Sequence, residues 1–278
     1  MDSPVPRKNL RKTAAFLLVF MGLAASITLW GTLRSIAVRR SRDVPAAQLP
    51  ESSLLARISF QSRQVFATRP GWQEYAAILE TLLPESILKT LKKPPPPRWV
   101  AGWTSTTAEP TLVADYPPGV PHPEDWQPEG TLWVINAQPI TKPQTNDSLA
   151  WAPGLALMVQ NRLHPEAVIW SAGVDTPWKG GLGQQLWNGF ADTQEAKRVS
   201  ESVATARTWL VWVEPQPDRV IIRADLECAS PQEAIRLEKD VESVIPPKSR
   251  LRFLTDGPWI SLQYTWQEKA AAPKPPSR

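Results

Sequence analysis

Residues 207–226 read RTWLVWVEPQPDRVIIRADL, with an apolar run on each side of Pro-Gln-Pro-Asp. Proline and aspartate favour turns, whereas the flanking tryptophans, valines and isoleucines favour strands. The stretch therefore predicts two strands, at 207–214 and 219–226, joined as a hairpin. Because the strands of a hairpin pair antiparallel, we expect an antiparallel sheet in this part of the chain.

A helix is predicted on each side of this hairpin. Asp192–Glu195 and Ser230–Glu233 both match a capping box, which satisfies backbone N–H groups at the start of a helix. Beyond the second helix the pattern predicts strands at 250–254 and 259–266. In the last strand apolar and polar residues alternate, which indicates one buried face.

The two predicted helices, near 193–206 and 231–245, match each other at a spacing of 38 residues. Five residues recur at this spacing: Gln194, Glu195, Ala196, Arg198 and Val203 return as Gln232, Glu233, Ala234, Arg236 and Val241. We interpret the match as an α-β-β unit used twice, with a degraded third copy within 73–115. Shared capping chemistry is the alternative explanation, because glutamate is favoured near the start of any helix.

The order of elements also predicts the fold class. With a further strand at 167–172, the order becomes β-α-β-β-α-β, which is the split β-α-β order of ferredoxin-like folds. We therefore predict an α+β fold with antiparallel sheet and helices on one face, since each helix has a single apolar stripe to bury. The expected divisions are an α+β subdomain at 56–172, an α-β-β repeat subdomain at 173–267 and a disordered tail at 268–278.

Residues 13–33 read TAAFLLVFMGLAASITLWGTL and contain no charged side chain. As a helix they would extend about 32 Å, enough to cross a hydrocarbon core of about 30 Å. With a basic tail at 1–12 and a polar juxtamembrane linker at 34–55, they predict a single-pass transmembrane helix of the signal-anchor type. A cleaved secretory signal and a buried core helix are the alternatives. The run is longer than most signal h-regions and lacks the polar face of a soluble helix.

The orientation of this anchor depends on its flanking charges, which balance. Four basic residues precede the run and four follow it: Arg7, Lys8, Arg11 and Lys12, then Arg34, Arg39, Arg40 and Arg42. Because Lys/Arg bias sets topology, equal numbers leave it undecided, but the short basic tail is typical of a secretory n-region. We therefore expect membrane localisation with the large domain outside the cytoplasm. The expected partners are the membrane, through residues 13–33, and a protein in or near it.

Composition excludes several other classes of partner and site. The net charge is +4, yet eight basic residues flank the apolar run, so the remaining domain is near neutral. It lacks the basic stripe of a nucleic-acid-binding protein. A single cysteine, Cys228, cannot form an intramolecular disulfide or a cysteine-based zinc cluster, and its place after an apolar strand predicts an inert thiol.

Both histidines stand in the same tripeptide, at His122–Glu124 and His164–Glu166. A metal pair with the two glutamates is one interpretation, but a zinc site needs three or four ligands. The favoured interpretation is a repeated loop that precedes a strand. Residues 174–191 form a Gly- and Trp-bearing connection. Its glycines at 180–183 do not follow a strand and precede no Gly-Lys-Ser/Thr, which argues against a phosphate-binding loop and favours a flexible connection. We predict no cofactor and no metal, and no catalytic residue is identified.

The chain contains 14 tryptophans, more than its phenylalanines and tyrosines together. Most lie in strand-like apolar runs and are expected in the core, although exposed indoles would suit stacking against sugars. The favoured hypothesis is a membrane-anchored, non-catalytic interaction or structural module. The alternatives are an anchored hydrolase or metal-dependent enzyme using the His-Pro-Glu segments, and a glycan-binding module. Exposure of indoles or imidazoles in one concave site would distinguish them.

Overall fold

The computed structural model describes residues 50–266, apart from residues 60, 84, 86, 89–94, 106–108, 117–118, 120–123, 137–152, 192, 244 and 246–248. The chain forms two compact units, Met1–Pro45 and Ala46–Arg278, and the described residues belong to the second. The predicted anchor at 13–33 and the tail at 268–278 lie outside them. Within the described ranges, no helix combines the length and apolar character needed to cross a membrane.

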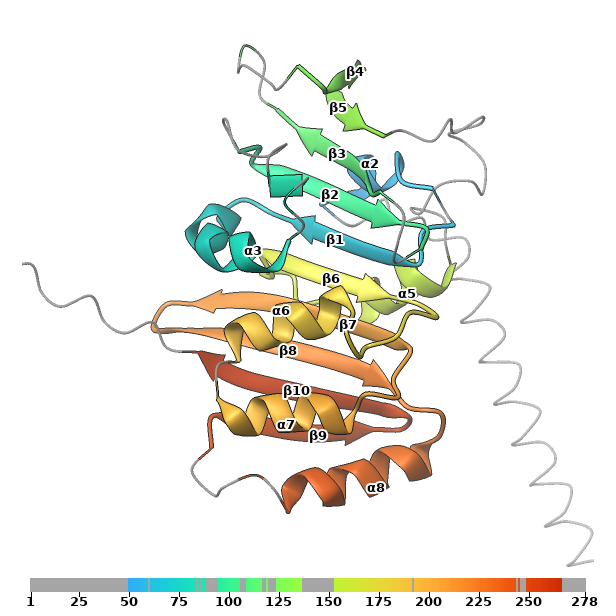
Figure 1. Cartoon of the computed structure of the whole chain (residues 1–278), viewed down its shortest axis with the longest axis vertical. Coiled ribbons are helices and arrows are strands. Elements are labelled where there is room, and N and C mark those ends of the chain that lie inside the picture. The colour runs from blue at the N-terminus through green and yellow to red at the C-terminus, as the bar shows by residue number, and fades with distance from the viewer. Residues whose placement is uncertain are drawn as a thin grey trace, which may run out of the picture. The chain divides into compact units, whose positions relative to one another are not determined.

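A single antiparallel sheet organises the second unit (Figure 1). The order of its ten described strands is β4-β5-β3-β2-β1-β6-β7-β8-β10-β9, and every neighbouring pair is antiparallel. The predicted combination of helices with a large antiparallel sheet is therefore confirmed. The strands are β1 (Gln64–Thr68), β2 (Arg98–Trp103), β3 (Thr111–Asp115), β4 (Gln127–Glu129), β5 (Leu132–Ile135), β6 (Ile169–Gly173), β7 (Thr208–Gln216), β8 (Arg219–Glu227), β9 (Leu251–Asp256) and β10 (Trp259–Trp266).

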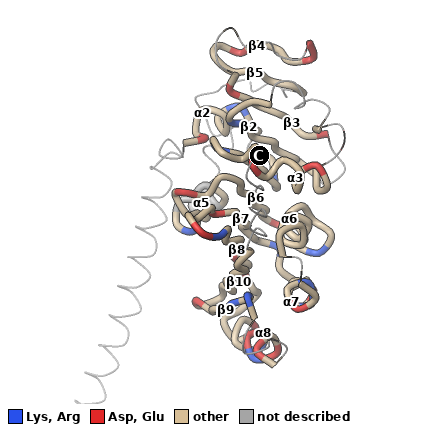
Figure 2. The backbone as a smooth tube through the Cα atoms, turned by 90° about the vertical axis from the view of Figure 1, so that its left-hand side faces the viewer, with Lys and Arg blue, Asp and Glu red and all other residues tan. Residues whose placement is uncertain are grey.

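Helices lie on both faces of the sheet. Figure 2 shows the sheet edge-on, with α3, α6, α7 and α8 on one side, the first face, and α2 and α5 on the other, the second face. The expectation of helices on one face is wrong because β1 and β6 are buried along their whole length and need cover on both sides. The helices are α2 (Ser52–Leu55), the 3-10 helix η2 (Trp72–Tyr75), α3 (Ala76–Leu82), α5 (Pro153–Arg162), α6 (Leu182–Phe190), α7 (Gln194–Ser202) and α8 (Pro231–Glu242).

Two halves of the sheet have the same strand order. The N-terminal half, residues 50–135, has the order β1-β2-β3-β5-β4, and the C-terminal half, residues 153–266, has the order β6-β7-β8-β10-β9. β1 pairs antiparallel with β6, with Phe66 opposite Ser171 at the centre. This pairing relates the strands of the two halves by an approximate twofold axis perpendicular to the sheet. The sheet continues across the boundary expected at residue 172, because β6 pairs with both β1 and β7.

Strand pairing gives each residue of one half an equivalent in the other. Trp99 pairs with Thr68, and Trp209 pairs with Gly173 at the matching position. Both indoles are fully buried on the first face. The two tryptophans therefore occupy equivalent places in the core.

The turns at the two ends of the sheet are equivalent as well. The β4–β5 turn contains Gly130, with φ of 67°, and the β9–β10 turn contains Gly257, with φ of 61°. Glycine is favoured in this left-handed region because a Cβ atom would strain it. The acidic residues before these glycines, Glu129 and Asp256, are therefore equivalent.

The ferredoxin-like expectation is wrong for the C-terminal half. That arrangement would place β6 beside β8, but β6 pairs with β7. Two helices, α6 and α7, connect these strands, so the chain enters β7 antiparallel to β6. A single connecting helix would return the chain to the end of the sheet where β6 begins, and the next strand would run parallel to β6. A single helix, α8, does connect β8 with β9, and β10 lies between them. One split β-α-β unit is thus present.

The prediction that α7 and α8 pack on the same face of the sheet is confirmed. The buried apolar residues of both helices, with Val203 at the C-cap of α7, belong to one core with β7, β8 and β10: Ala196, Val199 and Val203, then Ala234, Leu237 and Val241. These positions keep the spacing of 38 residues, but the caps do not. Thr193, rather than Asp192, caps α7 by accepting a hydrogen bond from the N–H of Ala196, whereas Ser230 caps α8 as predicted.

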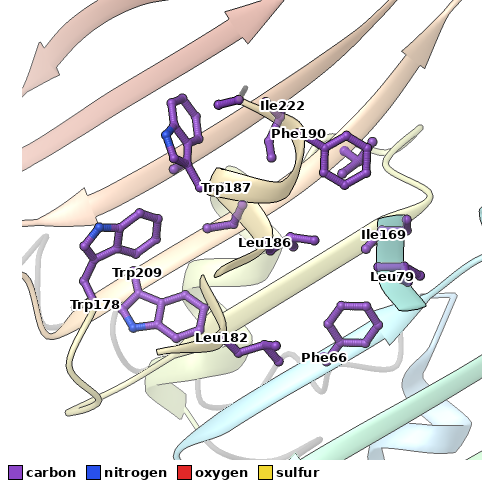
Figure 3. Close-up of a cluster of buried hydrophobic side chains, with 14 of the residues drawn as sticks. Phe66, Leu79, Ile169, Trp178, Leu182, Leu186, Trp187, Phe190, Trp209 and Ile222 are labelled. Atoms are coloured by element: carbon purple, nitrogen blue, oxygen red, sulfur yellow. The ribbon is translucent and has the colours of Figure 1, made fainter. Parts of the chain in front are cut away.

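Helix α6 fills the centre of the first face (Figure 3). It corrects the prediction of a flexible connection at 174–191, where the glycines disguised the pattern of Leu182, Leu186 and Phe190. The glycines allow close packing, since a Cβ atom on Gly183 would lie 2.6 Å from the Trp209 ring. Trp209 is therefore held between β6 and α6.

Candidate binding face

The second face of the N-terminal half is closed and apolar. A row of residues, each at most 2% exposed, crosses β1, β2, β3 and β5: Ala67, Val100, Val113 and Val134. Leu54 and Leu55 of α2, with Ile58, pack against it. A Cβ atom on Gly102 would lie 2.3 Å from Cγ2 of Ile58, so glycine lets this cover approach the sheet.

The equivalent row in the C-terminal half is partly polar. It crosses β6, β7, β8 and β10: Ala172, Leu210, Asp225 and Ser261. Asp225 thus replaces Val113, and Ser261 replaces Val134. Helix α5 packs on β6 and β7, while the second face of β8, β10 and β9 carries charged, polar and aromatic side chains. We call this surface the open face: Arg223, Asp225, Glu227, Arg252, Leu254, Asp256, Trp259, Ser261 and Gln263.

Arg162 at the end of α5 organises the centre of the open face. Its Nη1 atom lies 3.0 Å from Oδ2 of Asp225, which is 5% exposed, and its Nη2 atom lies 3.4 Å from Oδ2 of Asp256. Ser261 donates a hydrogen bond of 2.6 Å to the other oxygen of Asp225. The Arg162 guanidinium also lies 4.1 Å from the centre of the Trp259 ring, a cation–π distance. These contacts fix Arg162 and neutralise the buried carboxylate.

Two adjoining hollows flank Arg162, and Asn161 and Arg162 line both. One has a volume of about 620 Å³ and lies towards Glu227, Asp256 and Trp259. The other, which we call the arginine groove, has a volume of about 410 Å³. Both volumes fall within the range of small-ligand sites. The described residues lining the arginine groove are Asn161, Arg162, Trp212, Arg223, Asp225, Arg252, Phe253, Leu254, Ser261, Leu262 and Gln263.

Polar atoms beneath the arginine groove are incompletely paired. Trp212 is 3% exposed, and its indole N–H has no hydrogen-bond partner among the described residues. Nε of Arg223 lies 3.8 Å from Oε2 of Glu214, close enough for charge attraction but too far for a hydrogen bond. Glu214 is itself buried, with His164 Nδ1 at 3.7 Å. The groove therefore lies beside a buried ion pair and a free donor.

The alternative interpretation of the two His-Pro-Glu segments as a metal pair receives no support from the described part of the chain. His122 lies outside the described residues, and no group of three or more His, Cys, Asp or Glu side chains within them could hold a metal ion. The loop at His164 has a structural role instead. Arg69, paired with the fully buried Glu51, donates hydrogen bonds to the backbone oxygens of Pro165 and Ala167, at 2.7 and 3.1 Å.

The exposure of the tryptophans bears on the glycan-binding hypothesis, which needs exposed indoles. Nine of those described are buried, which agrees with the predicted role in the core. Trp133, Trp259 and Trp266 are half-buried. Of the three, Trp259 lines a hollow, and Arg162 occupies a position over its ring. A row of free indole faces for stacking sugars is therefore lacking among the described residues.

Cys228 is half-buried after β8. Burial, with smaller contributions from Glu233 and Glu227, raises the pKa of its thiol to about 11. Little thiolate exists at neutral pH, so low reactivity is expected, as predicted from the sequence.

Sequence reasoning did not identify the open face. Its residues come from α5, β8, β9 and β10, which are distant in the chain, and no motif joins them. The available signal was the polar set on the alternating last strand, Ser261 and Gln263, together with Asp225 inside an apolar strand. No family model, curated protein or solved structure matches this chain.

Proposed function

We propose that this protein is a non-catalytic interaction module, anchored in a membrane by residues 13–33, with its large domain outside the cytoplasm. Its partner is a protein in or near the same membrane, and the open face is the surface that binds it. The observation that carries the proposal is the difference between equivalent positions, Val113 and Val134 under α2 and Asp225 and Ser261 on the open face. A sheet needing only stability would be expected to close both halves in the same way.

An exposed apolar residue supports this choice of surface. Leu254 on β9 is 64% exposed, and Ile235 on α8 is the other strongly exposed large apolar side chain in the described ranges. Leu254 lies beside Ser261 in the sheet and lines the arginine groove. An apolar side chain at the rim of a polar groove is typical of a protein contact surface.

Fractionation tests the membrane part of the proposal. The full chain should stay with the membrane, and deletion of residues 1–40 should release the domain, because the apolar run is then lost. Protease added outside intact cells should digest the domain. Recovery of the full chain in the soluble fraction would contradict the anchor, and complete protection from protease would contradict the orientation.

Photocrosslinking in intact membranes tests the surface. A crosslinking amino acid at position 254 should trap one partner protein. The same residue at position 127 is the matched control, because Gln127 is exposed at the equivalent place on β4. Equal adducts from both positions, or none from position 254, would contradict the open face as the contact surface.

The enzyme hypothesis is less well supported. It depends on two histidine segments, and the one that is described is held by Arg69 as a structural loop. The buried tryptophans likewise give the glycan-binding hypothesis little support.

A further inference from the structure

We propose that the arginine groove binds an oxyanion, the carboxylate or phosphate group of a small ligand. This inference goes beyond the proposed function, since it adds a small-ligand site to the open face. Arg223 and Arg252 supply the charge, and the indole N–H of Trp212 supplies a further donor. The 410 Å³ volume suits a small ligand rather than a folded partner.

The donors form one line across the sheet. Trp212 pairs with Arg223, Arg223 with Gln263, and Gln263 with Arg252. Neighbouring strands are about 4.8 Å apart, so the two arginines start roughly 10 Å apart on the same face. Arginine side chains are long enough to converge on one anion over Gln263, whose amide adds a donor to the groove.

Charge also favours an anion. Three arginines and one acidic residue are among the described residues that line the groove. Asp225 is already occupied by Arg162 and Ser261. Glu214 lies beside Arg223 but outside the lining, so it offsets part of that charge, and Arg252 is exposed. An oxyanion can accept from two guanidinium groups at once, which a neutral ligand does less well.

The unpaired indole N–H of Trp212 adds to the argument by its place in the groove, since Nε1 of Trp99 and of Trp170 also has no partner among the described residues but neither ring lines the groove. Buried donors are nearly always paired, and Trp212 is 97% buried with no partner for Nε1 among the described residues. In the N-terminal half the equivalent position is Gly102, which carries no donor. The C-terminal half therefore has an N–H group beside a groove where its counterpart has none.

Calorimetric titration of the full chain in detergent tests the inference. Sodium phosphate and sodium succinate are the two probes, and sodium chloride at equal ionic strength controls for screening. We expect saturable binding of at least one probe in the millimolar range or tighter. Binding of phosphate alone indicates a phosphate group, and binding of succinate alone indicates a carboxylate.

Variants locate the site. Arg252→Gln should weaken binding about 10-fold or more, as expected for loss of a charge-assisted hydrogen bond. Trp212→Phe should weaken it less while leaving both arginines in place. Arg236→Gln, an exposed arginine on α8, is the matched control and should bind as the unaltered chain does. Circular dichroism and the melting temperature establish that each variant is folded.

Two results would overturn the inference: no saturable binding of either anion, or equal affinity in Arg252→Gln and Arg236→Gln. These results are separate from the crosslinking test. An adduct at position 254 without anion binding would leave the interaction module standing and remove the oxyanion. Anion binding without an adduct would support the groove and remove the protein partner.

Discussion

The two halves of the sheet share a strand order but differ on the second face. In the N-terminal half this face is a row of small and β-branched apolar residues sealed by α2. In the C-terminal half, the equivalent strands carry an aspartate, a serine and two arginines around grooves. The first face is a buried core in both halves. The shared order therefore reports how the protein folds, and the difference on one face is the basis of the proposed contact surface.

The difference also shows how a polar surface is tolerated on such a sheet. Asp225 is nearly buried, but its two oxygens accept from Arg162 and Ser261. A buried carboxylate without such partners would cost several kcal/mol. Gly102 leaves room for Ile58 to cover the N-terminal half of the sheet. At the equivalent position of the C-terminal half, the Trp212 side chain itself covers the sheet.

Val113→Asp is expected to have the largest effect, because it places the C-terminal residue type into the sealed half. Val113 is fully buried and no arginine of α2 lies at the position of Arg162, so the charge would be unpaired. We expect a loss of about 4–5 kcal/mol in the free energy of unfolding, or failure to fold. Denaturant titration would measure it. A loss below 1 kcal/mol, roughly that of a surface change, would show that the two faces do not differ as described.

Val203→Asp and Val241→Asp test the face that the halves have in common. Both valines are 1% exposed, at matching ends of α7 and α8. Each change should cost about 3–4 kcal/mol, slightly less than in the middle of the sheet, because a helix end can shift to hydrate the charge. Thermal melts of both proteins should move by similar amounts. If either melting temperature stays the same, that helix does not bury its stripe.

Asp225→Val should cost less, about 1–2 kcal/mol, because the partly exposed Arg162 keeps its ion pair with Asp256 when the pair with Asp225 is lost. Adding Ser261→Val recreates the valine pair of the N-terminal half. The double variant should recover part of the lost stability, because two apolar neighbours replace two polar ones, while the adduct at position 254 disappears. Denaturant titration and crosslinking measure the two effects. If the double variant crosslinks normally, the contacts among Arg162, Asp225 and Ser261 are not needed for binding the partner.

The smallest effect is confined to alkaline pH. Cys228 and Tyr116 occupy equivalent positions after β8 and β3. Burial raises the pKa of Cys228 from 9.0 to about 11 and that of Tyr116 from 10.0 to about 12. Both groups are neutral when protonated, so the folded state keeps the proton to higher pH than the unfolded state does. Stability should therefore be unaffected at neutral pH and fall as the pH rises from about 9 towards 12.

Iodoacetamide labelling would check the cysteine. A pKa higher by two units means about 100-fold less thiolate near pH 8, so labelling of the folded protein should be slower than that of the unfolded protein by about this factor. Cys228→Ser and Tyr116→Phe should each flatten part of the alkaline loss of stability. Rapid labelling of the folded chain near pH 8 would contradict the raised pKa.

Local pattern predicted much of the C-terminal half. The final strand was placed at 259–266, as the structure has it, because its alternation is regular and a turn precedes it. α8 follows its capping box. Helix α6 was missed because Gly181 and Gly183 weaken a helical pattern in sequence. A Cβ atom on Gly183 would lie too close to the Trp209 ring, and one on Gly181 would lie 2.5 Å from the carbonyl oxygen of Pro177. The ferredoxin-like order was wrong because α6 was missed. With α6 and α7 both between β6 and β7, the chain enters β7 in the opposite direction to the one predicted.

The sequence alone determined the elements whose signals are local: the alternating strands, the hairpin turns, the cap of α8 and the apolar stripes of α7 and α8. It also supports the prediction of an anchor at residues 13–33. Only the tertiary structure decided that β1 and β6 pair at the centre, which relates the two halves, and that the second face is sealed in one half and open in the other. The physical reason is the distance along the chain over which each interaction acts. Propensity and capping act within a few residues, whereas Arg162, Asp225 and Ser261 meet only once the sheet has formed.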